Sequence, residues 1–209
     1  SISLNGEGSV AFLSGQEGVV VQYALSNNQW IFKEIITPSV SSLQYVGITR
    51  ITSLECNKNN TVLSAVIKND YNAYILIFEY NGVSWSEVFV QQLSANNPET
   101  GKIYMHFEED YIAITDSIGR QKFLQIIKKD NNAWTFDQTI GDDEHGKINK
   151  NGEIIFIKKQ GNAIFSGSLD SQILPEVKVT NLIQYSDKIL AISGDGNICA
   201  IEQDNNINF

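Results

Sequence analysis

Three tryptophans stand at nearly regular intervals in the sequence, and their rings have the type and placement needed to stack on sugars or on a partner protein. Trp30, Trp85 and Trp134 are 55 and 49 residues apart, and each follows a short polar turn. The candidate ligand or interface residues are these rings with neighbouring aromatic and turn side chains: Trp30, Trp85, Trp134, Tyr80, Asn81 and Asp130. A large aromatic ring at a repeated strand position also covers a neighbouring sheet, and we favour this packing role.

Acid–base and metal chemistry have little support in the sequence. His106 lies in the expected strand KIYMHFE, and His145 follows Asp142-Asp143-Glu144 in what reads as a solvated acidic turn. Glu108-Glu109-Asp110 suggests a glycosidase carboxylate pair, but consecutive residues at a strand end point in different directions, so we expect a loop there. Phosphate loops, nucleophile elbows and zinc spacings are missing from the sequence. We therefore expect no enzyme activity and no cofactor.

The elements that must position the tryptophans repeat along the chain. Three segments align without a gap, each as an apolar strand, a turn of Asn, Gly or Asp, the Trp, and a further strand: VVVQYALSNNQWIFKEII, YILIFEYNGVSWSEVFVQ and FLQIIKKDNNAWTFDQTI. The Trp spacing is too long for one hairpin and suits a four-stranded propeller blade. No segment keeps a helical period. We predict an all-β fold, a β-propeller of about five four-stranded blades or a segment of a larger propeller.

The blades divide a single domain over residues 1–209. Their approximate bounds are 1–38, 47–95, 102–141, 146–180 and 181–209. The fourth has no Trp, and the fifth breaks off where its Trp strand is expected, so the ring is either closed with five blades or cut from a larger propeller. We favour a closed ring, because ~42 residues per blade is close to the usual size. We expect tight turns, the first two at Gln16-Glu17-Gly18 and Asn27-Asn28-Gln29.

The strand, short polar turn and Trp resemble the FG-GAP-type repeats of β-propellers, well in three units and weakly in all five. That resemblance implies calcium loops of the Asp-x-Asp-x-Asp-Gly type, which would use clustered carboxylates as ligands. The nearest segments, Asn57-Lys58-Asn59-Asn60, Asp142-Asp143-Glu144 and Asp195-Gly196-Asn197, lack the spaced carboxylates, and we interpret them as turns. Blade number and Trp usage also resemble tachylectin-like sugar-binding propellers.

Charge and composition limit the partners. A net charge of −9 argues against nucleic acid, whose binding depends on Lys and Arg clusters. No apolar run is long enough to span a membrane as a helix. Cys56 and Cys199 have no metal-ligand spacing, and a single disulfide between them stays open. The compartment is not indicated: virion, cell surface and cytoplasm all fit.

Two functions from different classes remain. The first is a non-enzymatic protein-interaction or structural scaffold module, whose partners are proteins of a larger assembly such as a virion or surface structure. The second is a carbohydrate-binding propeller, in which the rings of Trp30, Trp85 and Trp134 stack on glycans beside polar turn groups. Exposure of these rings discriminates the two, because rings buried between blades are unavailable to a sugar.

Overall fold

We describe a computed structural model of the whole chain. The description covers residues 1–14, 18–39, 50–69, 72–94, 103–105, 111–118, 121–141, 143–148, 153–158, 163–168, 176–180, 188–192, 199–203 and 206–208.

Every element in this part of the chain is a β-strand, and the strands form five antiparallel sheets in chain order, four of four strands and one of three. The first two sheets comprise β1 Ile2–Leu4, β2 Val10–Ser14, β3 Val20–Ser26 and β4 Gln29–Ile36, then β5 Arg50–Cys56, β6 Val62–Lys68, β7 Ala73–Tyr80 and β8 Trp85–Gln92. The third and fourth comprise β9 Ile103–Met105, β10 Tyr111–Ile118, β11 Gln121–Asp130 and β12 Ala133–Gly141, then β13 Asp143–Ile148, β14 Glu153–Lys158, β15 Ala163–Ser168 and β16 Glu176–Thr180. The fifth comprises β17 Lys188–Ile192, β18 Cys199–Gln203 and β19 Asn206–Asn208.

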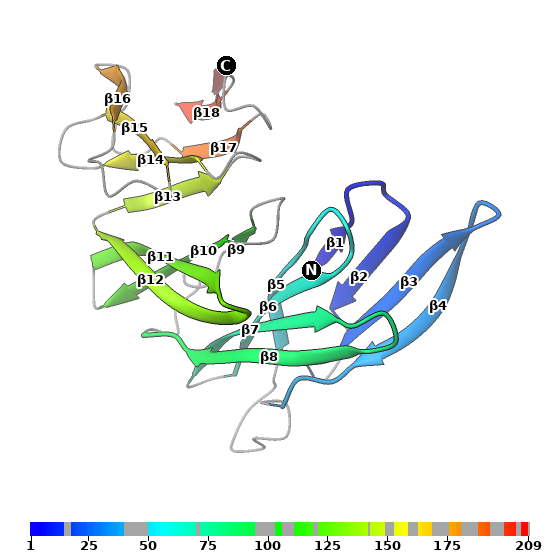
Figure 1. Cartoon of the computed structure of the whole chain (residues 1–209). Helices are drawn as coiled ribbons and strands as arrows, with labels where there is room; N and C mark the ends of the chain where they lie inside the picture. The colour runs from blue at the N-terminus through cyan, green and yellow to red at the C-terminus, as the bar shows by residue number, and fades with distance from the viewer. Residues whose placement is uncertain are drawn as a thin grey trace.

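The sheets follow one another along an arc (Figure 1). Their first strands contact each other in succession, β1 with β5, β5 with β9, β9 with β13, and β13 with β17, so these strands line the inner side of the arc. Figure 1 shows the first and fifth sheets apart, at the two ends of the arc. The prediction of an all-β fold of four-stranded units is confirmed. Within the described residues, no helix is long and apolar enough for a membrane span.

One segment departs from the sequence-based expectation. Residues 143–148, expected to begin as an acidic turn, form β13 instead, and Glu144 is the bulged residue between the partners of Lys158 and Ile157. The strand pairs because β14 supplies an apolar partner, EIIFIK, along its length. A bulge tolerates a residue that the ladder does not pair, which accommodates the charged run.

The hairpin turns use asparagine at positive φ. Asn27 and Asn28 both have positive φ between β3 and β4, and Asn131 and Asn132 repeat this between β11 and β12. Two consecutive positive φ angles match the twist of a two-residue hairpin, and asparagine tolerates them better than most residues. The turn predicted at residues 27–29 is confirmed at both asparagines, whereas Gln29 already belongs to β4.

A second kind of turn repeats between the first and second strands of sheets one and two. The Asn57 Oδ1 accepts from the backbone N–H groups of Thr61 and Val62 at 2.8 and 3.0 Å, and the Asn5 Oδ1 accepts from those of Ser9 and Val10 at the same distances. Both asparagines are buried. The side chain replaces a backbone partner and fixes the turn, which confirms the interpretation of Asn57–Asn60 as turn residues.

Substitution of Asn57 by alanine should destabilise the protein by about 2–4 kcal/mol, because two backbone donors in a buried turn lose their acceptor. Chemical denaturation checks this, with Lys58→Ala as the matched control on the exposed side of the same turn. Equal losses for the two variants would contradict the role of the Asn57 side chain.

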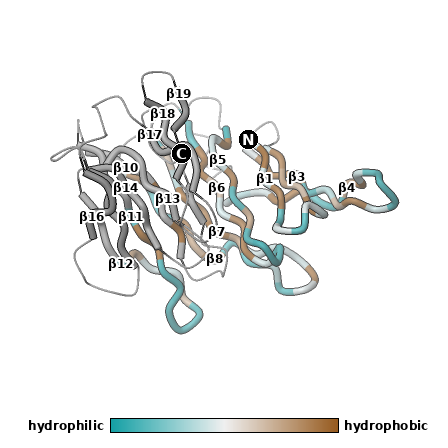
Figure 2. The backbone as a smooth tube through the Cα atoms, turned by 90° about the horizontal axis from the view of Figure 1, so that it is seen from above, coloured by the Kyte–Doolittle hydropathy of each residue, from teal (hydrophilic) through white to brown (hydrophobic). Residues whose placement is uncertain are grey.

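Two apolar clusters hold neighbouring sheets together. The first lies between sheets one and two and includes Phe12, Val20 and Ile36 against Leu63, Leu76 and Phe78. The second lies between sheets two and three and includes Val66, Ile75 and Ile77 against Ile112, Ile127 and Trp134. The two faces of β7 enter different clusters, because alternate residues of a strand point to opposite sides. Figure 2 shows hydrophobic residues along the strands and hydrophilic residues at the hairpin tips.

Candidate interaction surface

Trp85, at the start of β8, reaches back to the first sheet. Its ring packs edge-on against Phe12, with 5.4 Å between ring centroids and an interplanar angle of 89°. The indole Nε1–H donates to the Gln22 Oε1 at 3.2 Å, and the ring of Tyr80, the cross-strand partner of Trp85, lies 5.3 Å away. The structure therefore places Trp85 in the contact between the first two sheets, with Tyr80 beside it.

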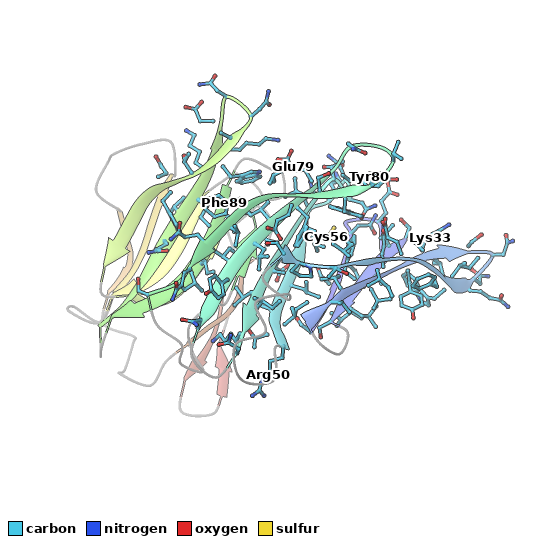
Figure 3. The ribbon with its side chains drawn as sticks, turned by 90° about the horizontal axis from the view of Figure 1, so that it is seen from below. Lys33, Arg50, Cys56, Glu79, Tyr80 and Phe89 are labelled. Atoms are coloured by element: carbon cyan, nitrogen blue, oxygen red, sulfur yellow. The ribbon has the colours of Figure 1, made fainter. Side chains whose placement is uncertain are left out.

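Trp134, at the second position of β12, makes the equivalent contact one sheet further along. It is only 5% exposed, and its indole Nε1–H donates to the Glu79 Oε1 at 2.7 Å. The Lys129 ammonium lies 2.8 Å from the same oxygen and 5.9 Å from the centre of the Trp134 ring. Next to them, Phe136 of the third sheet meets Phe89 of the second edge-on at 5.8 Å. Glu79 and Phe89, both labelled in Figure 3, thus contact the aromatic pair Trp134 and Phe136 of the next sheet.

Glu79→Ala should cost about 1–3 kcal/mol of stability, since it leaves the Trp134 indole N–H without its acceptor. A double-mutant cycle with Trp134→Phe should give a coupling free energy of about 1 kcal/mol, measured by chemical denaturation. Glu7→Ala, an exposed turn carboxylate, is the control. Additive losses for Glu79→Ala and Trp134→Phe would show that this hydrogen bond contributes nothing.

Trp30, in β4, differs from the other two. Its side chain is 47% exposed, and its indole N–H has no hydrogen-bond acceptor among the described residues. It stands on the face of the first sheet that points away from the second, because its cross-strand partner is Leu25 while Val20 and Gln22 occupy the opposite face. Lys33 marks this outlying hairpin in Figure 3.

Trp30 belongs to a continuous apolar face that crosses all four strands of the first sheet, which we call the free face. Cross-strand pairing arranges its members in rows: Ile2, Leu13, Val21 and Ile35; Leu4, Ala11, Tyr23 and Phe32; Leu25 and Trp30. Six of these are exposed, namely Ile2, Leu4, Leu25, Trp30, Phe32 and Ile35. No charged residue stands in these rows, so the face is an unpartnered apolar surface rather than a solvated sheet face.

A bulge in β4 aligns the free face. The register shifts between Gln22 and Tyr23, leaving Lys33 unpaired. Without this shift, Glu34 would fall on the free face and Ile35 on the face that meets the second sheet. The same shift recurs in β7–β8 and β11–β12, leaving Val88 and Asp137 unpaired, each three residues after its Trp. The three units therefore share a β-bulge in the fourth strand as well as the Trp.

A small hollow lies between the first two sheets. It has a volume of about 220 Å³ and is lined by Glu34, Ile35, Ile36, Thr37, Ser39, Phe78, Trp85 and Glu87. Glu87 accepts from the Ser39 hydroxyl at 2.6 Å and from its backbone N–H at 2.9 Å. The hollow thus combines an aromatic wall with two carboxylates.

The remaining candidates lie at hairpin tips or outside the described residues. Asn81 is exposed, and its Oδ1 accepts from the backbone N–H groups of Val83 and Ser84, while Asp130 is exposed at the end of β11. No group of three potential metal-ligating side chains occurs among the residues that the structure describes. The predicted residues that lie outside the described ranges are Gln16–Glu17, His106, Glu108–Asp110, Asp142 and Asp195–Asn197, and of His145 and Cys199 only the backbone is described. The prediction that Cys56 and Cys199 are not joined to each other, with a disulfide as the alternative, is not tested by the described residues.

No protein-family model matches the chain, and no curated protein matches it. Solved structures do. The chain is similar to a functionally unknown protein from Desulfotomaculum acetoxidans DSM 771, at 11% identity and a TM-score of 0.64, covering 96% of this chain and 61% of that one. It is also similar to the Dos1 propeller, at 9% identity and a TM-score of 0.63, covering 97% and 54%, and to a fission yeast complex of SREBP–SCAP binding domains, at 10% and 0.58, covering 99% and 56%.

These similarities confirm the fold class. The chain is built of four-stranded antiparallel sheets of the β-propeller type, and it covers part of larger propellers. Identities of this size show the fold alone.

Proposed function

We propose that the chain is a non-enzymatic protein-interaction module that acts as a structural scaffold in a larger assembly, and that the free face is its contact surface. The observation that carries the proposal is the exposure of six large apolar side chains on one face of one sheet, with Trp30 and Phe32 among them. A contiguous apolar patch of this kind marks an interaction site, because its burial removes apolar surface from water.

The chemistry of the free face suits a protein rather than a glycan or nucleic acid. Protein interfaces are enriched in aromatic residues and depleted of charge at their centre. The free face has both properties, with Tyr23, Trp30 and Phe32 together and no charge in its rows. The net charge of −9 adds no attraction for phosphate groups.

A charged substitution in the free face tests the proposal. The chain, its Phe32→Glu variant and its Val83→Glu variant are each immobilised, and proteins retained from the native source are identified by mass spectrometry. Val83 is 85% exposed at the β7–β8 turn, outside the free face, so its variant is the matched control. We expect a protein that the chain and the control retain and Phe32→Glu loses by tenfold or more. Identical retention by all three would contradict the proposal.

Carbohydrate binding is the second candidate, favoured by the hollow at Trp85. An aromatic wall beside Glu34 and Glu87 offers a stacking surface and hydrogen-bond acceptors for a sugar. A glycan array with the chain and with Glu87→Gln tests it: selective binding that the variant loses would support this candidate. Absence of selective binding would remove it.

We also propose that the repeat units are FG-GAP-like and lack calcium loops. The proposal is based on their shared pattern of an apolar strand, a short polar turn and a Trp. The turn at Asn57 uses its side-chain oxygen on backbone N–H groups, which leaves that oxygen engaged. Calorimetric titration with Ca²⁺ tests this, and we expect no heat of binding.

A further inference from the structure

We infer that the free face is a blade-to-blade interface, and that its occupant is one further propeller blade outside these 209 residues. That blade is a four-stranded antiparallel sheet with an apolar facing side and a Gln or Glu side-chain oxygen on its third strand. The inference rests on the proposed function and names its partner.

The three tryptophans occupy equivalent positions but differ in their contacts. Trp85 packs on the sheet before its own and donates its indole proton to Gln22 of β3, the third strand of that sheet. Trp134 does the same with Glu79 of β7, again the third strand of the preceding sheet. Trp30 has the same place in the repeat, after the same type of turn as Trp134, yet it is 47% exposed. Trp30 therefore occupies the position from which Trp85 and Trp134 contact the preceding sheet.

Phe32 also occupies a position whose equivalent, Phe136, contacts the preceding sheet. Phe136 stands two residues after Trp134 and meets Phe89 of the preceding sheet. Phe32 stands two residues after Trp30, on the same face, and is 52% exposed, against 40% for Phe136. The pair Trp30 and Phe32 thus repeats the pair Trp134 and Phe136, which Glu79 and Phe89 receive. A blade with those two groups has the complementary surface.

The arrangement of the sheets leaves room for such a blade. The first and fifth sheets lie apart in Figure 1, at opposite ends of the arc. The solved structures that the chain resembles, the Dos1 propeller among them, extend beyond the matched part, since the chain covers only 61%, 54% and 56% of them. A closed propeller buries both faces of every blade, whereas this arc leaves one face of the first blade in solvent.

A tandem extension tests the inference. A second copy of residues 50–102 is joined before Ile2, which reproduces the native spacing between β8 and the next first strand. This copy carries the Glu79 and Phe89 that natively receive an aromatic pair. The readout is hydrogen exchange of the Trp30 indole N–H in ¹H–¹⁵N spectra, assigned with Trp30→Phe. We expect Trp30 to exchange faster than Trp85 and Trp134 in the 209-residue chain, and at least tenfold slower once the copy is added.

The matched control is the same extension with Glu79→Ala and Phe89→Ala in the added copy. In this control the Trp30 indole N–H should exchange nearly as fast as in the 209-residue chain. A second extension, a copy of residues 1–49 that carries Phe12 and Gln22, covers the case in which the first copy does not fold. Fast Trp30 exchange in both extended chains, with the copies folded by amide protection, would overturn the inference.

Two other occupants give distinct results, and each would overturn it. Protection of Trp30 in the 209-residue chain at every concentration would mean that its own fifth sheet covers the face. Protection only at high concentration would mean that a second copy does. If the extensions fail while Phe32→Glu still loses a retained protein, the proposed function stands with another partner. If the extensions protect Trp30 and Phe32→Glu loses no retained protein, the free face contacts only another blade and the proposed function fails.

Discussion

Trp134→Ala should lower the free energy of unfolding by about 3–5 kcal/mol, whereas Trp30→Ala should change it by less than about 1 kcal/mol. The two residues have the same type and the same place in the repeat. Trp134 is 5% exposed and hydrogen-bonded to Glu79, so its removal opens a cavity between two sheets. Trp30 is 47% exposed on a face that no other sheet covers, so its truncation removes less buried surface and opens no cavity between sheets. The difference between them isolates the effect of a covering sheet.

Urea denaturation followed by far-ultraviolet circular dichroism measures both losses, because that signal does not depend on the removed indole. Trp85→Ala should fall nearer to Trp134→Ala, since Trp85 packs on Phe12 and donates to Gln22. A loss for Trp30→Ala as large as that for Trp134→Ala would mean that the free face is covered in solution.

The repeat and its strands could be predicted from sequence because strands and turns are local. Apolar runs bounded by turn residues place β3, β7 and β11, and the Asn pairs at 27–28 and 131–132 place the turns, since few residues tolerate positive φ. The packing role favoured for the tryptophans agrees with the contacts of Trp85 and Trp134.

The free face could not be predicted, because it depends on which sheet lies beside which. A similar apolar run occurs in VVVQYALS, whose alternate residues meet the second sheet or solvent, and in YILIFEY, both of whose sides are covered. The bulge at Lys33 also escapes a strict period of two, and it moves Ile35 onto the free face. The charged start of β13 likewise resembles a turn in sequence. It forms a strand because pairing with β14 overrides the local preference for a loop.

Phe12→Ala should cost about 3–5 kcal/mol, and Phe32→Ala at most about 1 kcal/mol, although both rings belong to the first sheet. Phe12 is fully buried against Trp85 in the contact with the second sheet, and Phe32 is 52% exposed on the opposite face, where it meets only Tyr23 among the described rings. Chemical denaturation measures the two losses. The Phe12 variant should also shift Trp emission to longer wavelength, because Trp85 loses its edge-on neighbour and gains water.

The comparison is sharpest in the chain extended by a copy of residues 50–102. The loss for Phe12→Ala should stay the same there, because the second sheet still covers that ring. The loss for Phe32→Ala should rise by about 0.5–1.5 kcal/mol, because the added sheet supplies an edge-on aromatic contact like that of Phe89 with Phe136, which itself stays 40% exposed. An unchanged Phe32 loss in a folded extended chain would mean that the free face takes something other than a blade. The first sheet would then be the point where this protein meets a partner of a different architecture.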